Sequence, residues 1–380
     1  MEKRYNFRIY PTKGQEIQIQ KNFGCVRFVY NHYLEKRVEA YNNGQGITSL
    51  NECCRDMTAL KHAEGYEWLN EADSNSLRYA LSDLDTAYMS FFRNVRNGGT
   101  VPGFPKFKHK REARQSYRSK NNIKRQSIQV LDKKIKIPKL GLVECRVSKR
   151  VEGRILSATV ILAPSGKYFV SVCCTEHVPR PLPKTGEAVG IHMGVRKLAT
   201  ASDGQEFENI RAFEKARRKI ARLQREMSRK PKDSANREKA RIKLARAYER
   251  ASNQKKDHLQ KLTTQLVRDY DVICIRDEKL NEIAKNPLYA KYVRDAGWGE
   301  FASQLEYKCS WYGKELIKIS NWHPSAQICS ACGTKSPEAT EKKQNKEWTC
   351  PNCGNRLNRA ANAAANILQE GMRAKSAQAG

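Results

Sequence analysis

The chain has 380 residues, of which 71 are Lys or Arg and 40 are Asp or Glu, so its formal net charge is +31. A hydrophobic content of 39% is typical of packed domains and argues against a disordered chain. The charge exceeds the roughly 2–8 that keeps a small domain soluble, and no stretch approaches the roughly 20 apolar residues of a membrane span. We therefore expect a cytoplasmic protein that binds a nucleic acid and not a membrane.

The first hundred residues predict a strand followed by helices. A strand-like run ends at Pro11, and residues 12–37 carry apolar side chains at helical spacing. A second helical block, 49–95, follows a Gly-rich turn and ends before Gly98-Gly99. We predict a helical module over residues 16–98.

From residue 101 to about 176 the pattern changes to short alternating runs separated by Gly or Pro, which predicts a β-barrel or sandwich. Its first part, residues 106–125, holds nine Lys or Arg against one acid, with Phe107, His109 and Tyr117 among them. Basic and aromatic side chains together suit phosphate contacts and base stacking. The alternative is an edge strand whose charges only prevent aggregation.

Residues 181–186 read as a linker, and the remainder alternates strands with helices. The predicted strands are 188–193, 198–202, 272–275 and 316–320, and the predicted helices are 213–229, 235–268 and 299–311. This alternation predicts an α/β domain.

Four of the twelve cysteines form a metal-binding pattern. Cys329 and Cys332 make one Cys-x2-Cys pair, Cys350 and Cys353 make another, and 17 residues separate the pairs. Four thiolates fill the tetrahedral shell of Zn²⁺ and leave no position for water, so we expect a structural zinc site. We interpret the other eight cysteines as small core residues.

Several segments together resemble the TnpB family, transposon-encoded RNA-guided nucleases related to type V CRISPR effectors. The resemblance covers nearly the whole chain. It rests on residues 7–11 (FRIYP), 24–31 (GCVRFVYN), 103–107 (GFPKF), 259–262 (LQKL), 295–301 (DAGWGEF), 305–308 (LEYK), 311–313 (WYG), the cysteine pairs, and Asn362 and Asn366 in NAAAN.

The resemblance implies a multidomain α+β fold. Residues 1–15 and 99–183 would form a β-barrel wedge domain with the helical recognition lobe, 16–98, inserted in it. Residues 184–326 and 357–380 would form a RuvC-like (RNase H-like) α/β domain, interrupted by a zinc ribbon at 327–356. An RNA similar to the family's guide RNA would pair with double-stranded target DNA and form an R-loop.

RuvC nucleases hold two divalent ions with carboxylates from two strands and a final helix. By resemblance, the family's first Asp corresponds to His192 in Gly190-Ile-His-Met-Gly194, its Glu to Arg276, and its last Asp to Ala360. All three acids are absent, so the resemblance implies an inactivated nuclease site and not an enzyme.

We expect no catalytic Mg²⁺ at these positions. A fixed positive charge such as Arg276 about 4 Å from a divalent ion is repelled by roughly 8 kcal/mol at an effective dielectric constant of 20. Asp277 cannot replace the missing Glu without a bulge, because successive strand residues point to opposite faces. His192 could ligate a soft metal; a packed or solvent-facing histidine is the interpretation we favour.

The basic segments and the ribbon are retained, which resembles the family's nuclease-dead repressors. We therefore expect an RNA-guided DNA-binding protein, associated with the bacterial nucleoid, that represses transcription by occupying promoter DNA next to a short adjacent motif. The alternatives are an active RNA-guided endonuclease with a rearranged site and a guide-free DNA-binding accessory protein of transposition.

Nucleic-acid contacts are expected at two sets of residues, the first implied by the resemblance and the second chosen from the basic segment 106–125. Residues expected to read the adjacent motif are Ser49, Ser74, Asn75, Arg78 and Ser119. Residues expected to contact the nucleic-acid backbone are Lys106, Lys108, Arg111, Tyr117 and Arg118. For each, a solvated surface residue is the alternative interpretation.

Overall fold

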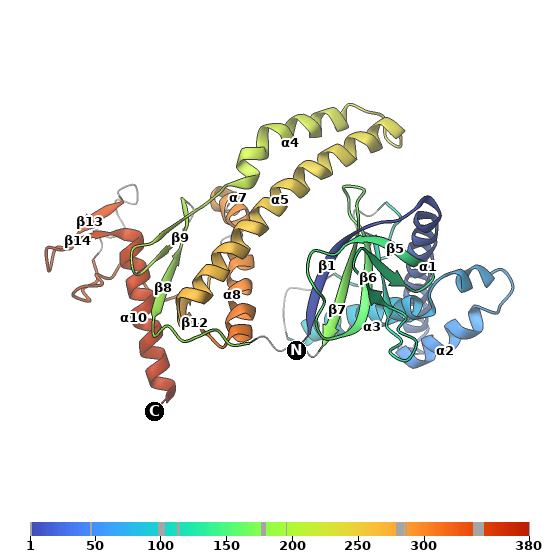
Figure 1. The fold of residues 1–380 in the computed structure, drawn as a ribbon, viewed down its shortest axis with the longest axis horizontal. Helices are drawn as coiled ribbons and strands as arrows, with labels where there is room; N and C mark the ends of the chain where they lie inside the picture. The colour runs from blue at the N-terminus through green and yellow to red at the C-terminus, as the bar shows by residue number, and fades with distance from the viewer. Residues whose placement is uncertain are drawn as a thin grey trace. The chain divides into compact units, whose positions relative to one another are not determined.

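The computed structural model describes residues 2–45, 48–97, 103–111, 115–175, 180–194, 196–278, 285, 287–336 and 346–379. The chain divides into two compact units, Met1–His177 and Val178–Gly380 (Figure 1). The predicted boundaries at 98/99 and the middle of the ribbon, 337–345, lie outside the described residues. No helix in the described part of the chain is long and apolar enough to cross a bilayer.

The first unit combines helices with an antiparallel sheet. Its helices are α1 (Lys13–Asn42), α2 (Leu50–Leu60), the 3-10 helix η1 (Glu67–Glu71) and α3 (Ser74–Arg96). Its strands are β1 (Lys3–Tyr10), β2 (Gln115–Lys120), β3 (Gln129–Val130), β4 (Lys134–Ile137), β5 (Gly141–Arg146), β6 (Arg154–Leu162) and β7 (Tyr168–Thr175). The described part of residues 16–98 holds most of α1, all of α2 and α3, and the 3-10 helix η1.

Local sequence explains the start of this unit. The alternation of β1 turns Tyr5, Phe7 and Ile9 into the core. α1 then begins at Lys13 because the Thr12 side chain accepts from the N–H of Gln15, while the Gln15 side chain accepts from the N–H of Thr12.

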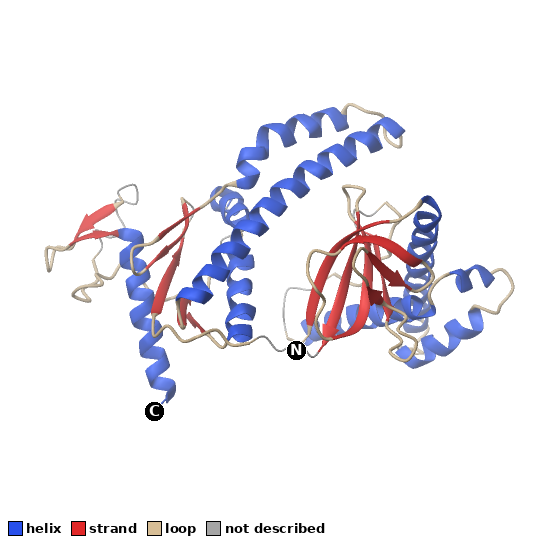
Figure 2. Cartoon of the chain, in the orientation of Figure 1, coloured by secondary structure: helices blue, strands red, loops and turns tan. Residues whose placement is uncertain are grey.

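The sheet of the first unit has the order β2-β6-β7-β1-β5-β4-β3. All pairings are antiparallel. In the described residues β2 and β3 are the two edges and do not pair with each other, so hydrogen bonds do not close the sheet into the predicted barrel. The strands are drawn in red in Figure 2.

The second unit is an α/β domain around a five-stranded sheet. Its strands are β8 (Ala188–Met193), β9 (Lys197–Ala201), β10 (Glu206–Glu208), β11 (Val272–Arg276) and β12 (Glu315–Ile319), in the order β10-β9-β8-β11-β12. Its helices are α4 (Ala212–Ser228), α5 (Ala235–Asp269), α7 (Pro287–Ala296), α8 (Trp298–Tyr312) and α10 (Arg359–Ala379). β8 to β10 are antiparallel, and β11 joins β8 and β12 in parallel.

Both faces of this sheet are covered. Val189 and Ile191 of β8 point into a cluster with α5 and α8. α10 covers the other face, where a β-carbon on Gly190 would lie 2.1 Å from the Ala364 carbonyl oxygen. Only glycine permits this close packing of α10 on β8.

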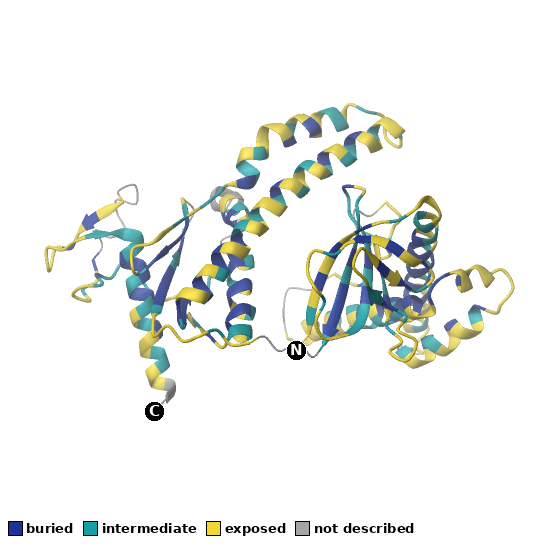
Figure 3. Cartoon of the chain, in the orientation of Figure 1, coloured by how far each residue is buried: buried dark blue, intermediate teal, exposed yellow. Residues whose placement is uncertain are grey.

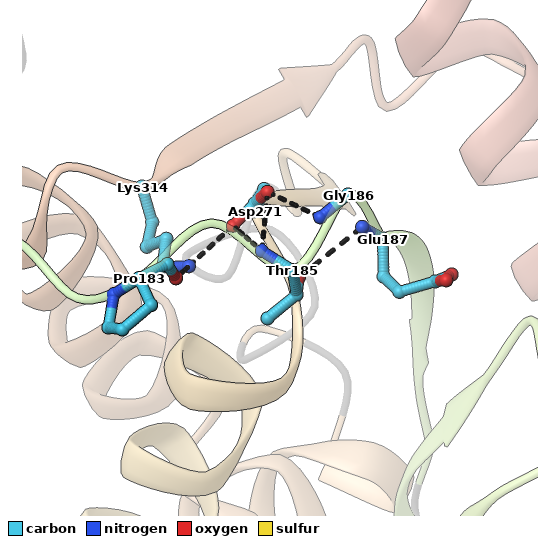
Figure 4. A network of polar contacts seen from close by, with 6 residues as sticks. All are labelled: Pro183, Thr185, Gly186, Glu187, Asp271 and Lys314. Atoms are coloured by element: carbon cyan, nitrogen blue, oxygen red, sulfur yellow. Dashed lines mark hydrogen bonds and ion pairs between the residues drawn. The ribbon is translucent and has the colours of Figure 1, made fainter.

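A polar network fixes the end of the sheet where β8 and β11 begin. The carboxylate of Asp271 accepts hydrogen bonds from the N–H groups of Thr185 and Gly186 and pairs with Lys314 (Figure 4). Lys314 also donates to the Pro183 carbonyl at 2.7 Å. The Lys314 ammonium and these N–H groups hold the pKa of Asp271 far below its usual value, so the network is ionised at neutral pH.

α4 and α5 form a long hairpin (Figure 1). A small cluster of Ile220, Leu223 and Leu244 joins the two helices. Outside that seam the hairpin is mostly exposed or half-buried (Figure 3). The predicted helix bounds agree with the structure to within one residue at each end.

Candidate functional site

The four paired cysteines meet at one point of the second unit. Their sulfur atoms lie within 4.8 Å of one another. The Cys329–Cys353 and Cys332–Cys350 sulfur distances are both 3.7 Å, and a zinc ion with 2.3 Å bonds to sulfur needs a tetrahedron with edges of about 3.8 Å. The cluster is therefore compatible with structural zinc binding.

Two similar turns present these sulfurs. Gly333 and Gly354 follow the second cysteine of each pair with φ of 75° and 71°, which glycine adopts without strain. Their N–H groups donate to the carbonyls of Cys329 and Cys350 at 2.8 and 2.9 Å. Hydrogen bonds, chiefly with Thr334, lower the pKa of Cys332, whereas at Cys353 the lowering by the Asn355 N–H is outweighed by contacts with the other three sulfurs, which raise the pKa. One thiolate of this pair is therefore favoured before a metal binds.

Asn362 and Asn366 attach this zinc-ribbon segment to α10. Both amides donate to the Ile328 carbonyl at 2.7 Å, and the Asn362 side chain accepts from the Ser330 N–H at 2.8 Å. Both asparagines are 3% exposed and lie four residues apart, on one face of α10. Asn362 and Asn366 therefore have a structural role, because their side chains hold the first cysteine turn against α10.

His192 and Arg276 lie side by side in the parallel part of the sheet. Ile191 of β8 pairs with Ile275 of β11, so the next residues of the two strands are His192 and Arg276. Alternation places both on the face that α10 covers, together with Gly190. The structure therefore brings together two of the three positions predicted to have lost their acids.

Ala360, the third position, lies at the same end of the sheet. Lys375, near the end of α10, pairs with Glu315 at the start of β12, so the first turn of α10 lies toward the ends of the parallel strands. The Asn358 side chain accepts from the N–H groups of Ala360 and Ala361 at 3.0 and 3.1 Å. Asn358 therefore caps α10 with a neutral amide.

Glu278 was not among the predicted site residues, yet it contacts Arg276. The guanidinium Nε donates to Glu278 Oε1 at 2.7 Å, and Nη2 lies 2.5 Å from the same oxygen. The Glu278 side chain is 9% exposed. Because this carboxylate offsets the charge of Arg276, the repulsion of a metal is weaker than the sequence argument assumed. Asp277 is exposed.

The Arg276–Glu278 pair should contribute strongly to the stability of the second unit. We expect Glu278→Ala to lower the free energy of unfolding by about 2 kcal/mol, between the values for exposed and buried pairs, because it leaves the Arg276 guanidinium, which is 27% exposed, without its partner. Urea denaturation measures this change. The control is Asp257→Ala, which breaks the exposed Lys261–Asp257 pair of α5 and should cost less than about 1 kcal/mol; equal effects would contradict the structural role of Glu278.

His192 is partly buried and neutral at pH 7. Burial, and secondarily the Arg276 guanidinium, lower its pKa from 6.5 to about 4. Below pH 6.5 the unfolded chain therefore binds a proton that the folded chain excludes. We expect stability to fall by up to about 3 kcal/mol between pH 6.5 and 4 for this reason. His192→Gln should remove this part of the pH dependence in urea titrations; an unchanged pH profile would contradict it.

The predicted nucleic-acid contacts separate into surface and core residues. Ser49, Ser74, Asn75 and Arg78 are exposed at the first turns of α2 and α3. Lys106 and Arg111 are exposed, while Lys108 and Arg118 are half-buried. The Lys108 ammonium lies 3.8 Å from the Tyr30 ring centre, and the Arg118 guanidinium lies at the same distance from the Tyr79 ring centre.

Tyr117 and Ser119 do not agree with their predicted role. They are 2% and 0% exposed, because the alternation of β2 turns both toward the core. The Tyr117 ring packs edge-on against Phe23 of α1, with ring centres 5.8 Å apart. Neither side chain is accessible to a nucleic acid in this structure, so Tyr117 is a packing residue.

Solved structures of similar fold are effector proteins. A chain of the Cas12f1–sgRNA–target DNA complex matches with a TM-score of 0.59, 12% identity, and coverage of 97% of this chain and 98% of that one. The mini-RNA-guided endonuclease Cas_phi3 matches with a TM-score of 0.51, 9% identity, and coverage of 97% and 92%. These likenesses show a mixed α/β multidomain fold of the kind seen in compact Cas12 effectors.

Sequence relatives define the family. A Streptomyces pristinaespiralis protein named "Putative RNA-guided DNA endonuclease" is 35% identical over 99% of this chain and 91% of its own length. InsQ of Escherichia coli K12, with the same designation, is 31% identical over 97% and 92%. The chain therefore belongs to the TnpB family, also known as the IS605 OrfB family.

Three segments match described domain families. Residues 171–286 match "Probable transposase", 298–367 match "Cas12f1-like, TNB domain", and 1–46 match "Helix-turn-helix domain". The second match contains all four cysteines and the two asparagines of α10. The first 46 residues fold as β1 and one long helix, α1, within their described part.

Proposed function

We propose that this protein is an RNA-guided DNA-binding protein without nuclease activity, which represses transcription by occupying promoter DNA beside a short adjacent motif. The observation that carries the proposal is the site formed by His192, Arg276 and Ala360. This site contains a neutral histidine, an arginine that is paired with Glu278, and the methyl group of Ala360. These residues lie at the ends of β8 and β11 and at the start of α10.

Such a site offers little to a divalent cation. Mg²⁺ requires several oxygen ligands in a near-octahedral arrangement. The Glu278 carboxylate could become a metal ligand only after its ion pair with Arg276 broke. Breaking this partly buried ion pair costs about 2 kcal/mol, between the values for exposed and buried pairs. A bound R-loop would therefore persist uncut, and a bound protein excludes RNA polymerase from the same DNA.

Binding would be divided between base pairing and protein contacts. The guide RNA would read the target sequence, while exposed residues such as Asn75 and Arg78 would contact the adjacent motif. Arg is suited to a bidentate contact with guanine. The large positive charge would supply affinity for the phosphate backbones of both nucleic acids.

The experiment that tests this proposal begins with the RNA that co-purifies with the full-length protein. Sequencing that RNA should reveal one structured species with a variable end, and a DNA duplex complementary to that end should be retarded on a gel. A protein that leaves cells without RNA but still binds DNA would support the guide-free accessory role. Guide-dependent nicking would support an active endonuclease, the role that the names of its relatives favour.

A further inference from the structure

Gly24 lies in the middle of α1, where glycine is one of the least favourable residues for a helix. Its φ is not positive, unlike that of the turn glycines. A β-carbon built on Gly24 would meet no heavy atom within 4 Å. Neither backbone conformation nor packing within the described chain therefore requires glycine here. A remaining reason is a partner that approaches the helix backbone closely.

Gly24 lines two adjoining hollows of the first unit. Their volumes are about 330 and 770 Å³, and Arg27 lines both. The larger hollow runs between α1 and the start of β2 and reaches Tyr168 of β7. Together they form a groove along α1, which we call the Gly24 groove.

The Gly24 groove is mainly basic. Its charged lining residues are Lys13, Lys21, Arg27 and Lys110 on the basic side and Glu16 and Glu35 on the acidic side. Lys21 pairs with Glu71. Lys13 and Lys110 are exposed, Arg27 is half-buried, and none of the three makes an ion pair with another described residue, so their charges are open to solvent and available to a ligand. A phosphodiester backbone has the complementary charge.

Aromatic rings stand at one end of the groove. Phe28, one turn beyond Gly24, stacks on His32 with ring centres 5.4 Å apart, and both line the smaller hollow. The Trp68 ring meets Phe28 edge-on at 5.1 Å and is 40% exposed. Aromatic surfaces bind bases that are free to unstack, as in single-stranded RNA, whereas a DNA duplex keeps its bases stacked inside.

We infer that the Gly24 groove binds an unpaired segment of the guide RNA. The sugar–phosphate backbone passes directly over Gly24, Arg27 and Lys110 contact its phosphates, and a base lies against the Phe28 ring. This inference rests on the proposed function, because it needs a guide RNA, and it adds the place on the protein where part of that RNA lies.

The test uses Gly24→Leu in the full-length chain. Leucine favours a helix more than glycine does, so the melting temperature should rise by about 2 °C. The same side chain would block the backbone path, so affinity for RNA should fall at least tenfold, or about 1.4 kcal/mol. The probe is the RNA extracted from the purified wild-type protein, which is labelled and then bound to each variant. An unrelated DNA duplex serves as a second probe for comparison.

The matched control is Gly14→Leu. Gly14 lies in the first turn of α1, also has no heavy atom within 4 Å of a built β-carbon, and does not line the groove. It should leave RNA affinity unchanged. Unchanged RNA affinity of Gly24→Leu would overturn the inference, as would a loss confined to the DNA duplex or equal for both probes. A wild-type protein that yields no RNA would instead refute the proposed function itself.

Discussion

The triple variant His192→Asp, Arg276→Glu, Ala360→Asp should cleave guide-matched DNA in Mg²⁺, whereas the unmodified protein should not. The three positions lie on adjacent strands and at the helix end that points toward them, so three carboxylates placed there would face one another. They would supply the oxygen ligands that divalent cations need for hydrolysis. We expect the cleavage rate to rise by at least about a thousandfold, a barrier change of about 4 kcal/mol. Linearisation of a target plasmid measures it.

The partial restorations serve as controls for this experiment. A variant with Asp at positions 192 and 360 that retains Arg276 should remain inactive, because the Arg276–Glu278 pair still occupies the site. Adding Arg276→Gln instead removes the positive charge and frees the Glu278 carboxylate, so the cleavage rate of this variant shows how far Glu278 can replace the missing ligand. If the double restoration cleaved as fast as the triple, the inactivating role that we assign to Arg276 would be wrong.

Loss of zinc should unfold the ribbon and weaken its attachment to α10. Structural zinc in small domains contributes roughly 10–16 kcal/mol of apparent binding free energy, more than a segment with so small a core can replace. Among the described residues of the ribbon, the hydrophobic cluster has three buried members, Cys329, Trp348 and Cys350, two of which belong to the four-cysteine cluster. We therefore expect Cys350→Ser to abolish zinc binding and make the ribbon sensitive to proteases.

The matched control for the zinc experiment is Cys54→Ser. Cys54 lies in α2 of the first unit, is not one of the four clustered cysteines, and is only partly buried. Mass spectrometry of the purified proteins should find about one zinc per chain in the unmodified protein and in Cys54→Ser, and none in Cys350→Ser. Retention of zinc by Cys350→Ser together with an intact ribbon would contradict the four-thiolate site.

Strong periodic signals in the sequence predicted most of the second unit. The structure contains the strand predicted by the apolar run of β11 and the helices predicted by the long amphipathic segments. It also brings together the four cysteines, as their spacing predicted. Seven of the eight remaining cysteines are buried, as expected of small core residues. In the first unit, the closed barrel was not confirmed, because pairing between strands far apart in sequence leaves no local pattern.

The site details that sequence reasoning missed depend on side-chain direction. Tyr117 and Ser119 looked available in a basic segment, but strand alternation could have assigned both to the buried face. Glu278 stands two residues after Arg276, a spacing that permits pairing on one side of an extended chain. The capping role of Asn358 could also have been predicted from the sequence, since asparagine is favoured at the N-cap of a helix. The Gly24 groove could not have been predicted from the sequence, because open space beside a glycine is visible only in the three-dimensional structure.

Binding and cleavage of the target DNA can be measured on one substrate. The purified protein with its own RNA is incubated with a labelled DNA duplex that carries the matching target, in Mg²⁺ and in Mn²⁺, and each sample is divided between footprinting and a denaturing gel. We predict a guide-dependent footprint over the target with every DNA strand intact. Cleavage of either strand that requires the matching guide would contradict the account.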